Sequence, residues 1–178
     1  MGRLIFVGGG ARSGKSALAL RLAAAIGPRR AFLATAQAFD DEMRERIERH
    51  QAEREGGYQT IEEPIDVPGA VRDLSGCDVL LLDCITLWVS NLLVAEHTDI
   101  QPRVAALIDA IAAAEFDVVV VSNEVGQGIV PMNPLARRFR DETGWAHQAL
   151  SAAAAEVYYG ALGMMLRLKP GPVEPVLT

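Results

Sequence analysis

The sequence has few cysteines: Cys77 and Cys84 are the two among its 178 residues. They fit neither a disulfide framework nor a zinc site, so a reducing, cytoplasmic environment is expected. No apolar run approaches the roughly 20 residues that a membrane-spanning helix needs. The chain moves directly into an apolar strand without a signal-peptide pattern, and it contains no internal repeat. These absences predict a protein with no disulfides and no membrane span.

Positive charge is also scarce, because 17 Lys and Arg residues face 23 Asp and Glu residues, for a net charge of −6. Binding to nucleic acid needs a basic surface, so no nucleic-acid partner is expected. Binding to a single nucleotide needs only a local positive site and stays open. The chain length indicates one domain with a sizeable core, predicted over residues 1–169. The proline-rich residues 170–178 are expected to form a mobile tail.

Continuous Val, Leu and Ile runs alternate with helical patterns along the chain. Strands are predicted at Leu4–Val7, Ala31–Ala34, Tyr58–Ile61, Val79–Leu82, Val118–Val121, Val157–Tyr159 and Met164–Leu168. Helices are predicted at Ser16–Ile26, Asp40–Glu55, Thr86–Ala95, Val104–Ala114 and Pro134–Ala155, the last interrupted or bent near Gly144. This order predicts an α/β fold with a mainly parallel sheet, helices on both faces and an antiparallel C-terminal edge.

A glycine-rich stretch between the first strand and the first helix matches the phosphate-binding pattern G-x-x-x-x-G-K-[ST]. Its residues are Gly9, Gly10, Ala11, Arg12, Ser13, Gly14, Lys15 and Ser16. In this pattern backbone N–H groups and the helix N-terminus surround phosphate oxygens. The lysine reaches the β- and γ-phosphates, and the last hydroxyl contacts Mg²⁺. The stretch therefore predicts binding of a nucleoside triphosphate with Mg²⁺.

Three further groups follow predicted strands or begin a helix. Asp83 is interpreted as a second Mg²⁺ contact, with a cap for the following helix as the alternative. The segment Asn123–Pro131 has the composition of a binding loop, and a plain surface loop is equally compatible with it. Arg137, Arg138 and Arg140 either contact phosphate or an acidic substrate, or form a solvated basic face. Cys84 is expected to be a small buried residue, and His147 is compatible with core, surface or substrate contact.

His50 belongs to the same stripe of the predicted helix as Phe39, Met43, Ile47 and Arg54, because their spacing is three or four residues. From periodicity alone, a partly buried structural histidine is the favoured interpretation. The alternative is a nucleophile or general base near the nucleotide, since neutral imidazole attacks phosphorus well.

Several segments together resemble one family over nearly the whole chain. They are GGGARSGKS at 8–16, Ala34-Thr35-Ala36, Asp40–Met43 leading to His50, DCIT at 83–86, NLL at 91–93, NEVGQGIVP at 123–131 and LARRFRD at 135–141. These segments are similar to the bifunctional adenosylcobinamide kinase/adenosylcobinamide-phosphate guanylyltransferase family of cobalamin biosynthesis. The resemblance implies a RecA-like P-loop NTPase core, assembled as a homotrimer.

The resemblance also implies two reactions. ATP or GTP first phosphorylates the aminopropanol hydroxyl of adenosylcobinamide. GMP is then transferred from GTP to the adenosylcobinamide phosphate through a GMP–histidine intermediate, which places His50 as the nucleophile, and pyrophosphate is released. The implied nucleotide contacts beyond the phosphate-binding loop are Ala34, Thr35, Ala36, Gln51, Ala52, Glu53, Arg54, Glu62 and Asp83.

The chain departs from the family pattern at two positions. Asp83 stands where relatives often carry Glu, and its shorter reach favours a water-mediated contact to the metal over direct ligation. His147 stands where relatives often carry Asn. Two other functions remain compatible with the motifs: a single-function small-molecule kinase with a structural His50, and a nucleotide-dependent switch without transfer chemistry.

Overall fold

The computed structural model describes residues 2–37 and 57–176. The helix predicted at 40–55, which carries His50 and the positions 51–54, lies outside the described residues.

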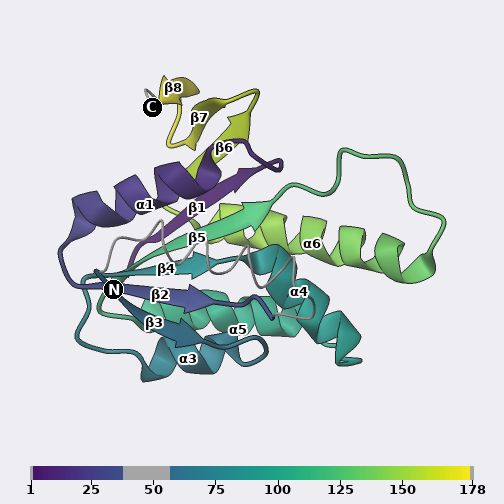
Figure 1. The fold of residues 1–178 in the computed structure, drawn as a ribbon, viewed down its shortest axis with the longest axis horizontal. Helices are drawn as coiled ribbons and strands as arrows, with labels where there is room; N and C mark the ends of the chain where they lie inside the picture. The colour runs from purple at the N-terminus through teal and green to yellow at the C-terminus, as the bar shows by residue number, and fades with distance from the viewer. Residues whose placement is uncertain (1, 38–56, 177–178) are drawn as a thin grey trace.

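The described residues form an eight-stranded sheet (Figure 1). The strands are β1 (Leu4–Gly9), β2 (Arg30–Ala34), β3 (Tyr58–Glu62), β4 (Val79–Asp83), β5 (Asp117–Asn123), β6 (Glu156–Ala161), β7 (Met164–Lys169) and β8 (Glu174–Val176). Their spatial order is β3-β2-β4-β5-β1-β6-β7-β8. Pairing is parallel from β3 to β6 and antiparallel from β6 to β8. The predicted mainly parallel sheet with an antiparallel C-terminal edge is confirmed.

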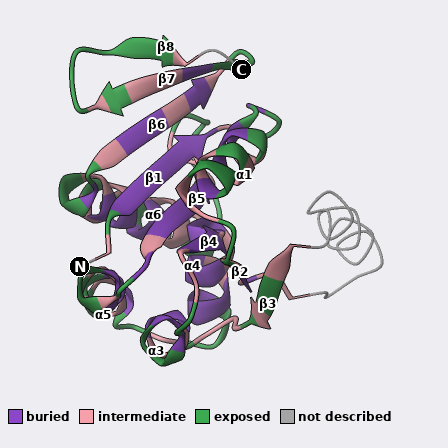
Figure 2. Ribbon diagram, turned by 90° about the vertical axis from the view of Figure 1, so that its left-hand side faces the viewer, coloured by how far each residue is buried: buried purple, intermediate pink, exposed green. Residues whose placement is uncertain are grey.

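Helices cover both faces of this sheet (Figure 2). They are α1 (Lys15–Ile26), α3 (Val67–Asp73), α4 (Ile85–Val94), α5 (Ile100–Ala113) and α6 (Pro134–Ala153). Alternate residues of β1 belong to different core clusters: Ile5 and Val7 pack with α1, whereas Leu4 and Phe6 pack with the other four helices. Both faces are therefore buried, which explains the continuous apolar runs. None of the helices within 2–37 and 57–176 has the length and apolar character needed to cross a membrane.

Two helices differ from the prediction. The helix α6 runs through Gly144 without interruption over 20 residues. One glycine costs about 1 kcal/mol in a helix, which the Asn133 cap and the burial of Ala146 and Leu150 offset. The short helix α3 was not predicted. Its sequence signal is Asp66, whose side chain accepts a hydrogen bond from the Gly69 N–H, followed by a proline in the first turn.

Part of the C-terminal segment expected to be mobile is paired in the structure. Glu174–Val176 form β8, which lies antiparallel to β7 in register with Met165–Arg167. Across this pair of strands, Arg167 Nη2 forms an ion pair with Glu174 Oε2 at 2.5 Å. The prolines end regular structure at 170–172, yet they leave the following residues able to pair as an edge strand.

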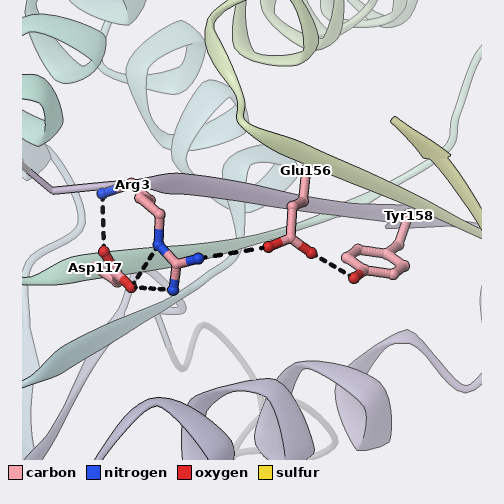
Figure 3. Close-up of polar contacts among 4 residues, drawn as sticks. All are labelled: Arg3, Asp117, Glu156 and Tyr158. Atoms are coloured by element: carbon pink, nitrogen blue, oxygen red, sulfur yellow. Dashed lines mark hydrogen bonds and ion pairs between the residues drawn. The ribbon is translucent and has the colours of Figure 1, made fainter. Parts of the chain in front are cut away.

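A polar cluster ties together the amino ends of the three central strands β1, β5 and β6 (Figure 3). Arg3 donates from its backbone N–H to Asp117 Oδ1 at 2.9 Å and from Nη2 to Oδ2 at 2.6 Å. Its Nη1 lies 3.8 Å from Glu156 Oε1, and the Tyr158 hydroxyl donates to Glu156 Oε2 at 2.5 Å. Burial alone would raise the pKa of Asp117, but the hydrogen bonds from Arg3 lower it below its usual range. Burial and then Glu156 raise the pKa of Tyr158 to about 12.

An Arg3→Ala variant is expected to unfold at lower urea concentration, with a loss of about 1 kcal/mol, because Arg3 is half-exposed but binds Asp117 in a bidentate manner. Arg21→Ala is the matched control, since Arg21 is exposed on α1 and forms no ion pair with any residue that the structure describes. Equal urea midpoints for the two variants would contradict a stabilising role for the cluster.

Candidate active site

The carboxyl ends of six parallel strands meet at one edge of the sheet, where ligands bind in folds of this kind (Figure 1). Ala34 at the end of β2 lies opposite both Glu62 and Asp83, which end β3 and β4. Gly9, which begins the phosphate-binding loop, lies opposite Asn123 at the end of β5. The tertiary structure therefore brings all five of these predicted site positions to the same edge. Glu62 is exposed on the outer strand.

The phosphate-binding loop packs closely against β6 and leads into α1. A Cβ atom added at Gly9 would lie 2.7 Å from the Gly160 carbonyl oxygen, so this approach requires glycine. Gly14 has a φ of 90° and occupies the N-cap position of α1 without a side-chain cap. The first turn of a helix has N–H groups without intrahelical partners. Because no side chain caps them here, they are available to an anion at the helix N-terminus.

Lys15 is the buried cation of this edge, with 8% of its surface exposed. Its Nζ donates to the Gly10 carbonyl oxygen at 3.0 Å, the one hydrogen bond it makes within the described ranges. Burial lowers the pKa of Lys15, and the nearby charge of Asp83 opposes that shift. Two of the three ammonium donors remain for phosphate oxygens.

Asp83 ends β4, and the next residue, Cys84, occupies the N-cap position of α4. Ser16 lies in the first turn of α1, and its hydroxyl and the Asp83 carboxylate are oxygen donors of the kind that Mg²⁺ prefers. Since Mg²⁺ keeps several waters and phosphate oxygens, two protein ligands suffice, and the residues present fit the ion.

The ends of β2, β4 and β5 are joined by a buried hydrogen-bond network. The Thr35 hydroxyl donates to the Cys84 carbonyl oxygen at 2.8 Å and accepts from the Cys84 N–H at 2.9 Å. Asn91 Nδ2 donates to the Thr35 carbonyl oxygen at 2.7 Å, and Asn123 Nδ2 donates to Thr86 Oγ1 at 3.2 Å. The Thr35 side chain, predicted to contact nucleotide, is fully buried in this network. Its neighbours Ala34 and Ala36 are half-buried.

Sequence reasoning missed the roles of Thr86 and Asn91. The available signal was an amide within the mainly apolar helix ITLWVSNLLV, because a buried amide needs hydrogen-bond partners. The prediction for Cys84 is confirmed: it is buried, its Sγ lies 3.0 Å from Thr86 Oγ1, and burial raises its pKa to about 11. It is therefore protonated at neutral pH and unsuited to act as a nucleophile.

Arginines of α6 hold the segment 123–131 in place. Arg140 donates to the carbonyl oxygens of Gly126 and Gly128, the latter at 2.8 Å. Arg137 donates to those of Pro131 and Met132 at 3.0 and 2.6 Å. Arg137 and Arg140 thus bind the carbonyl groups of a loop that lacks regular secondary structure.

The remaining arginine of this group and the loop glutamine have other partners. Arg138 donates to the His97 carbonyl oxygen at 3.3 Å, and its Nε lies 3.8 Å from Glu142 Oε1. Gln127 Nε2 donates to the Tyr159 hydroxyl at 2.8 Å, which anchors the loop to β6. The loop is thus attached to elements on two sides.

His147 lies on the inner side of α6 and reaches the end of β5. Its Nε2 is 2.7 Å from the hydroxyl oxygen of Ser122, which is fully buried, and its Nδ1 is 3.8 Å from Glu124 Oε2. Its ring also contacts Phe6, with centroids 5.5 Å apart. Of the three environments predicted for His147, the structure shows a mostly buried side chain at the edge of the core.

His50, Gln51, Ala52, Glu53 and Arg54 lie outside the described residues, so their predicted roles stay predictions.

The sequence profile of the CobU family, described as cobinamide kinase / cobinamide phosphate guanyltransferase, matches residues 5–168. The bifunctional adenosylcobalamin biosynthesis protein CobP of Pseudomonas aeruginosa is 41% identical over 167 residues, covering 93% of this chain and 96% of the relative. CobU of Salmonella typhimurium, which carries the same description, is also 41% identical, over 93% of this chain and 99% of the relative. CobU of Escherichia coli is 38% identical with the same coverage.

Among solved structures, that of the RadB recombinase superposes with a TM-score of 0.51 at 18% identity, over 93% of this chain and 79% of that chain. This likeness concerns the fold. Together with the phosphate-binding loop between β1 and α1, it identifies the predicted P-loop NTPase architecture.

Proposed function

The chain belongs to the cobinamide kinase / cobinamide phosphate guanyltransferase family, and we propose that it catalyses both reactions in that description. A nucleoside triphosphate phosphorylates the hydroxyl of adenosylcobinamide, and GTP then donates GMP to the resulting phosphate. The observation that carries the proposal is the buried Lys15 in a glycine loop that shares its sheet edge with Asp83, inside a family match over residues 5–168.

In the kinase step, the loop and Lys15 hold the triphosphate. The uncapped N–H groups of α1 bind the phosphate oxygens. The Lys15 ammonium stabilises the negative charge that develops as the terminal phosphoryl group is transferred. Mg²⁺ held by Ser16 and Asp83 would add positive charge at the same oxygens. These groups are preorganised by the fold, so little reorganisation is needed during transfer.

In the guanylyl step, we propose that His50 forms a bond to the α-phosphorus of GTP while the bond to pyrophosphate breaks. The cobinamide phosphate oxygen then attacks the same phosphorus and releases His50. This role comes from the family resemblance, and it uses the nucleophilicity of neutral imidazole. Residues 51–54, Ala34, Ala36 and Glu62 are proposed to hold the nucleotide. A homotrimer in the cytoplasm is proposed on the same resemblance.

The decisive experiment is incubation of the purified protein with Mg²⁺ and GTP labelled at the α-phosphate. The proposal expects an acid-labile, alkali-stable label on the protein, which is released as adenosylcobinamide-GDP when adenosylcobinamide phosphate is added. A single-function kinase would transfer label from the γ-position only. A nucleotide-dependent switch would consume no nucleotide in response to cobinamide. Either of these results would contradict the bifunctional assignment.

A further inference from the structure

The first residue after β5, Glu124, is attached to the phosphate-binding loop. Its backbone N–H donates to the Gly9 carbonyl oxygen at 2.9 Å. Because β5 pairs directly with β1, this bond continues the sheet beyond its last register pair, Gly9 with Asn123. The Glu124 side chain therefore begins beside the entrance of the loop that holds the phosphates.

The Glu124 carboxylate is oriented by one oxygen and leaves the other available. Its Oε1 accepts a hydrogen bond from the Gly126 N–H at 2.5 Å. Its Oε2 lies 3.8 Å from His147 Nδ1, beyond hydrogen-bond distance, and accepts no hydrogen bond from any residue in the ranges 2–37 and 57–176. The side chain keeps 25% of its surface exposed, and it can therefore be reached from solvent.

The surrounding loop is built around this carboxylate. A Cβ atom added at Gly126 would lie 2.8 Å from Glu124 Oε1, so glycine leaves the space that the carboxylate occupies. Arg140 holds the carbonyl groups of Gly126 and Gly128, and Gln127 is bound to Tyr159. A carboxylate held in this way loses little conformational freedom when it meets a substrate.

His147 lies beside the Glu124 carboxylate, with its Nδ1 3.8 Å from Oε2. Ser122 fixes the imidazole through Nε2, which turns Nδ1 toward Glu124 Oε2. Burial lowers the pKa of His147, and Glu124 opposes the shift. Its other neighbours, Phe6 from β1 and Ser122 from β5, carry no charge. At neutral pH the ring is therefore neutral, and it does not draw the Glu124 carboxylate into an ion pair.

Two other carboxylates at this edge are less suited to accept a proton from a substrate. Asp83 is assigned to the metal, and Glu62 ends the outermost strand β3. Glu124 directly follows β5, which lies between β4 and β1 and thus between the strand that ends at Asp83 and the strand that leads into the phosphate-binding loop. Of these three carboxylates, Glu124 therefore lies nearest to the middle of the sheet.

We propose that Glu124, oriented by the Gly126 N–H, is the general base of the kinase step, and that neutral His147 beside it leaves its Oε2 free of an ion pair with the ring. This inference rests on the proposed function. The cobinamide hydroxyl oxygen forms a bond to the γ-phosphorus as the bond to the leaving nucleoside diphosphate breaks, and the hydroxyl proton passes to Glu124 Oε2. The guanylyl step needs no such base, because the cobinamide phosphate that attacks is already deprotonated.

The first test is a Glu124→Gln variant, which keeps the acceptor for the Gly126 N–H and removes the base. The rate of cobinamide phosphorylation is expected to fall about 100-fold or more, with KM for ATP little changed. GMP transfer to supplied adenosylcobinamide phosphate is expected to persist. Glu115→Gln, at the opposite edge of the sheet, is the matched control and should match wild type in both assays.

A kinase rate within threefold of wild type in Glu124→Gln would overturn the proposal, and so would an equal loss of both activities, which would indicate a structural role. Wild-type protein that phosphorylates no cobinamide would instead overturn the proposed function itself. The two failures are thereby distinguished.

The second test is the pH profile of the kinase step in His147→Asn. In wild type, acidification protonates His147, and the imidazolium then pairs with Glu124 and weakens it as a base. Because burial lowers the pKa of His147, this loss of kinase rate is expected at a pH below about 6.5, the ordinary pKa of histidine. Asparagine cannot become charged. The variant should therefore match the wild-type kinase rate near neutral pH, and its rate should begin to fall only at a lower pH than in wild type. An acid limb at unchanged pH would overturn the role of His147.

Discussion

A Lys15→Ala variant is expected to lose both activities, with each rate lowered about 100-fold to 1,000-fold. The ammonium is the cation of the phosphate-binding loop, and its single hydrogen bond within the described residues, to the Gly10 carbonyl oxygen, leaves donors for phosphate. Both reactions break a bond within the triphosphate and release a negatively charged group. One cation therefore serves both transfers, and steady-state rates in the two separate assays check the prediction.

The loss should arise from chemistry and not from unfolding. Lys15 is buried, and burying a charge with few partners costs free energy, so its removal is not expected to destabilise the fold. A Lys15→Met variant, which retains the apolar stem, should melt at or above the wild-type temperature while it stays inactive. An active Lys15→Met variant, or one that loses only one of the two reactions, would contradict a shared phosphate site.

A His50→Ala variant is expected to lose GMP transfer entirely, with a decrease of roughly 10,000-fold or more, because a covalent route has no substitute for its nucleophile. The acid-labile label from α-labelled GTP should disappear with it. The kinase step uses the phosphate-binding loop and needs no covalent histidine, so it should remain within a few-fold of wild type. Radiolabel on the protein and product formation in the two assays measure these outcomes.

His97→Ala is the matched control, since His97 lies between α4 and α5 and contacts Arg103 at 3.3 Å. It should retain the label and both activities. Persistence of the label in His50→Ala would place the nucleophile at another residue. Equal GMP-transfer rates for His50→Ala and wild type would support a structural histidine, as periodicity alone suggested.

The different effects expected from substitutions at Lys15, His50 and Glu124 separate the two reactions. Lys15 is expected to act in both, His50 in guanylyl transfer, and Glu124 in phosphorylation. A protein that uses one phosphate-binding loop for two transfers needs such a division, because the reacting phosphorus differs: γ in the first reaction and α in the second.

Several features of the fold could be predicted because they depend on local sequence. Apolar runs such as Val79–Leu82 and Val118–Val121 required burial on both faces, which only a parallel sheet covered by helices provides. The interruption that the sequence offered as one alternative near Gly144 is absent, because the tertiary packing of α6 outweighs the local cost of one glycine. In β8, pairing with β7 orders residues whose own composition favours a loop.

By itself, the sequence determined that this chain has a phosphate-binding loop between a strand and a helix, an acidic residue at the end of a buried strand and the motifs of one family. These depend on neighbouring residues. The tertiary structure alone decided how distant polar groups pair: Thr35 with Cys84, Arg140 with the loop carbonyls, and Glu124 with Gly9 and Gly126. The physical reason is that a polar group inside the protein needs a hydrogen-bond partner close to it in space. That partner can come from any position along the chain, so the sequence alone does not identify it.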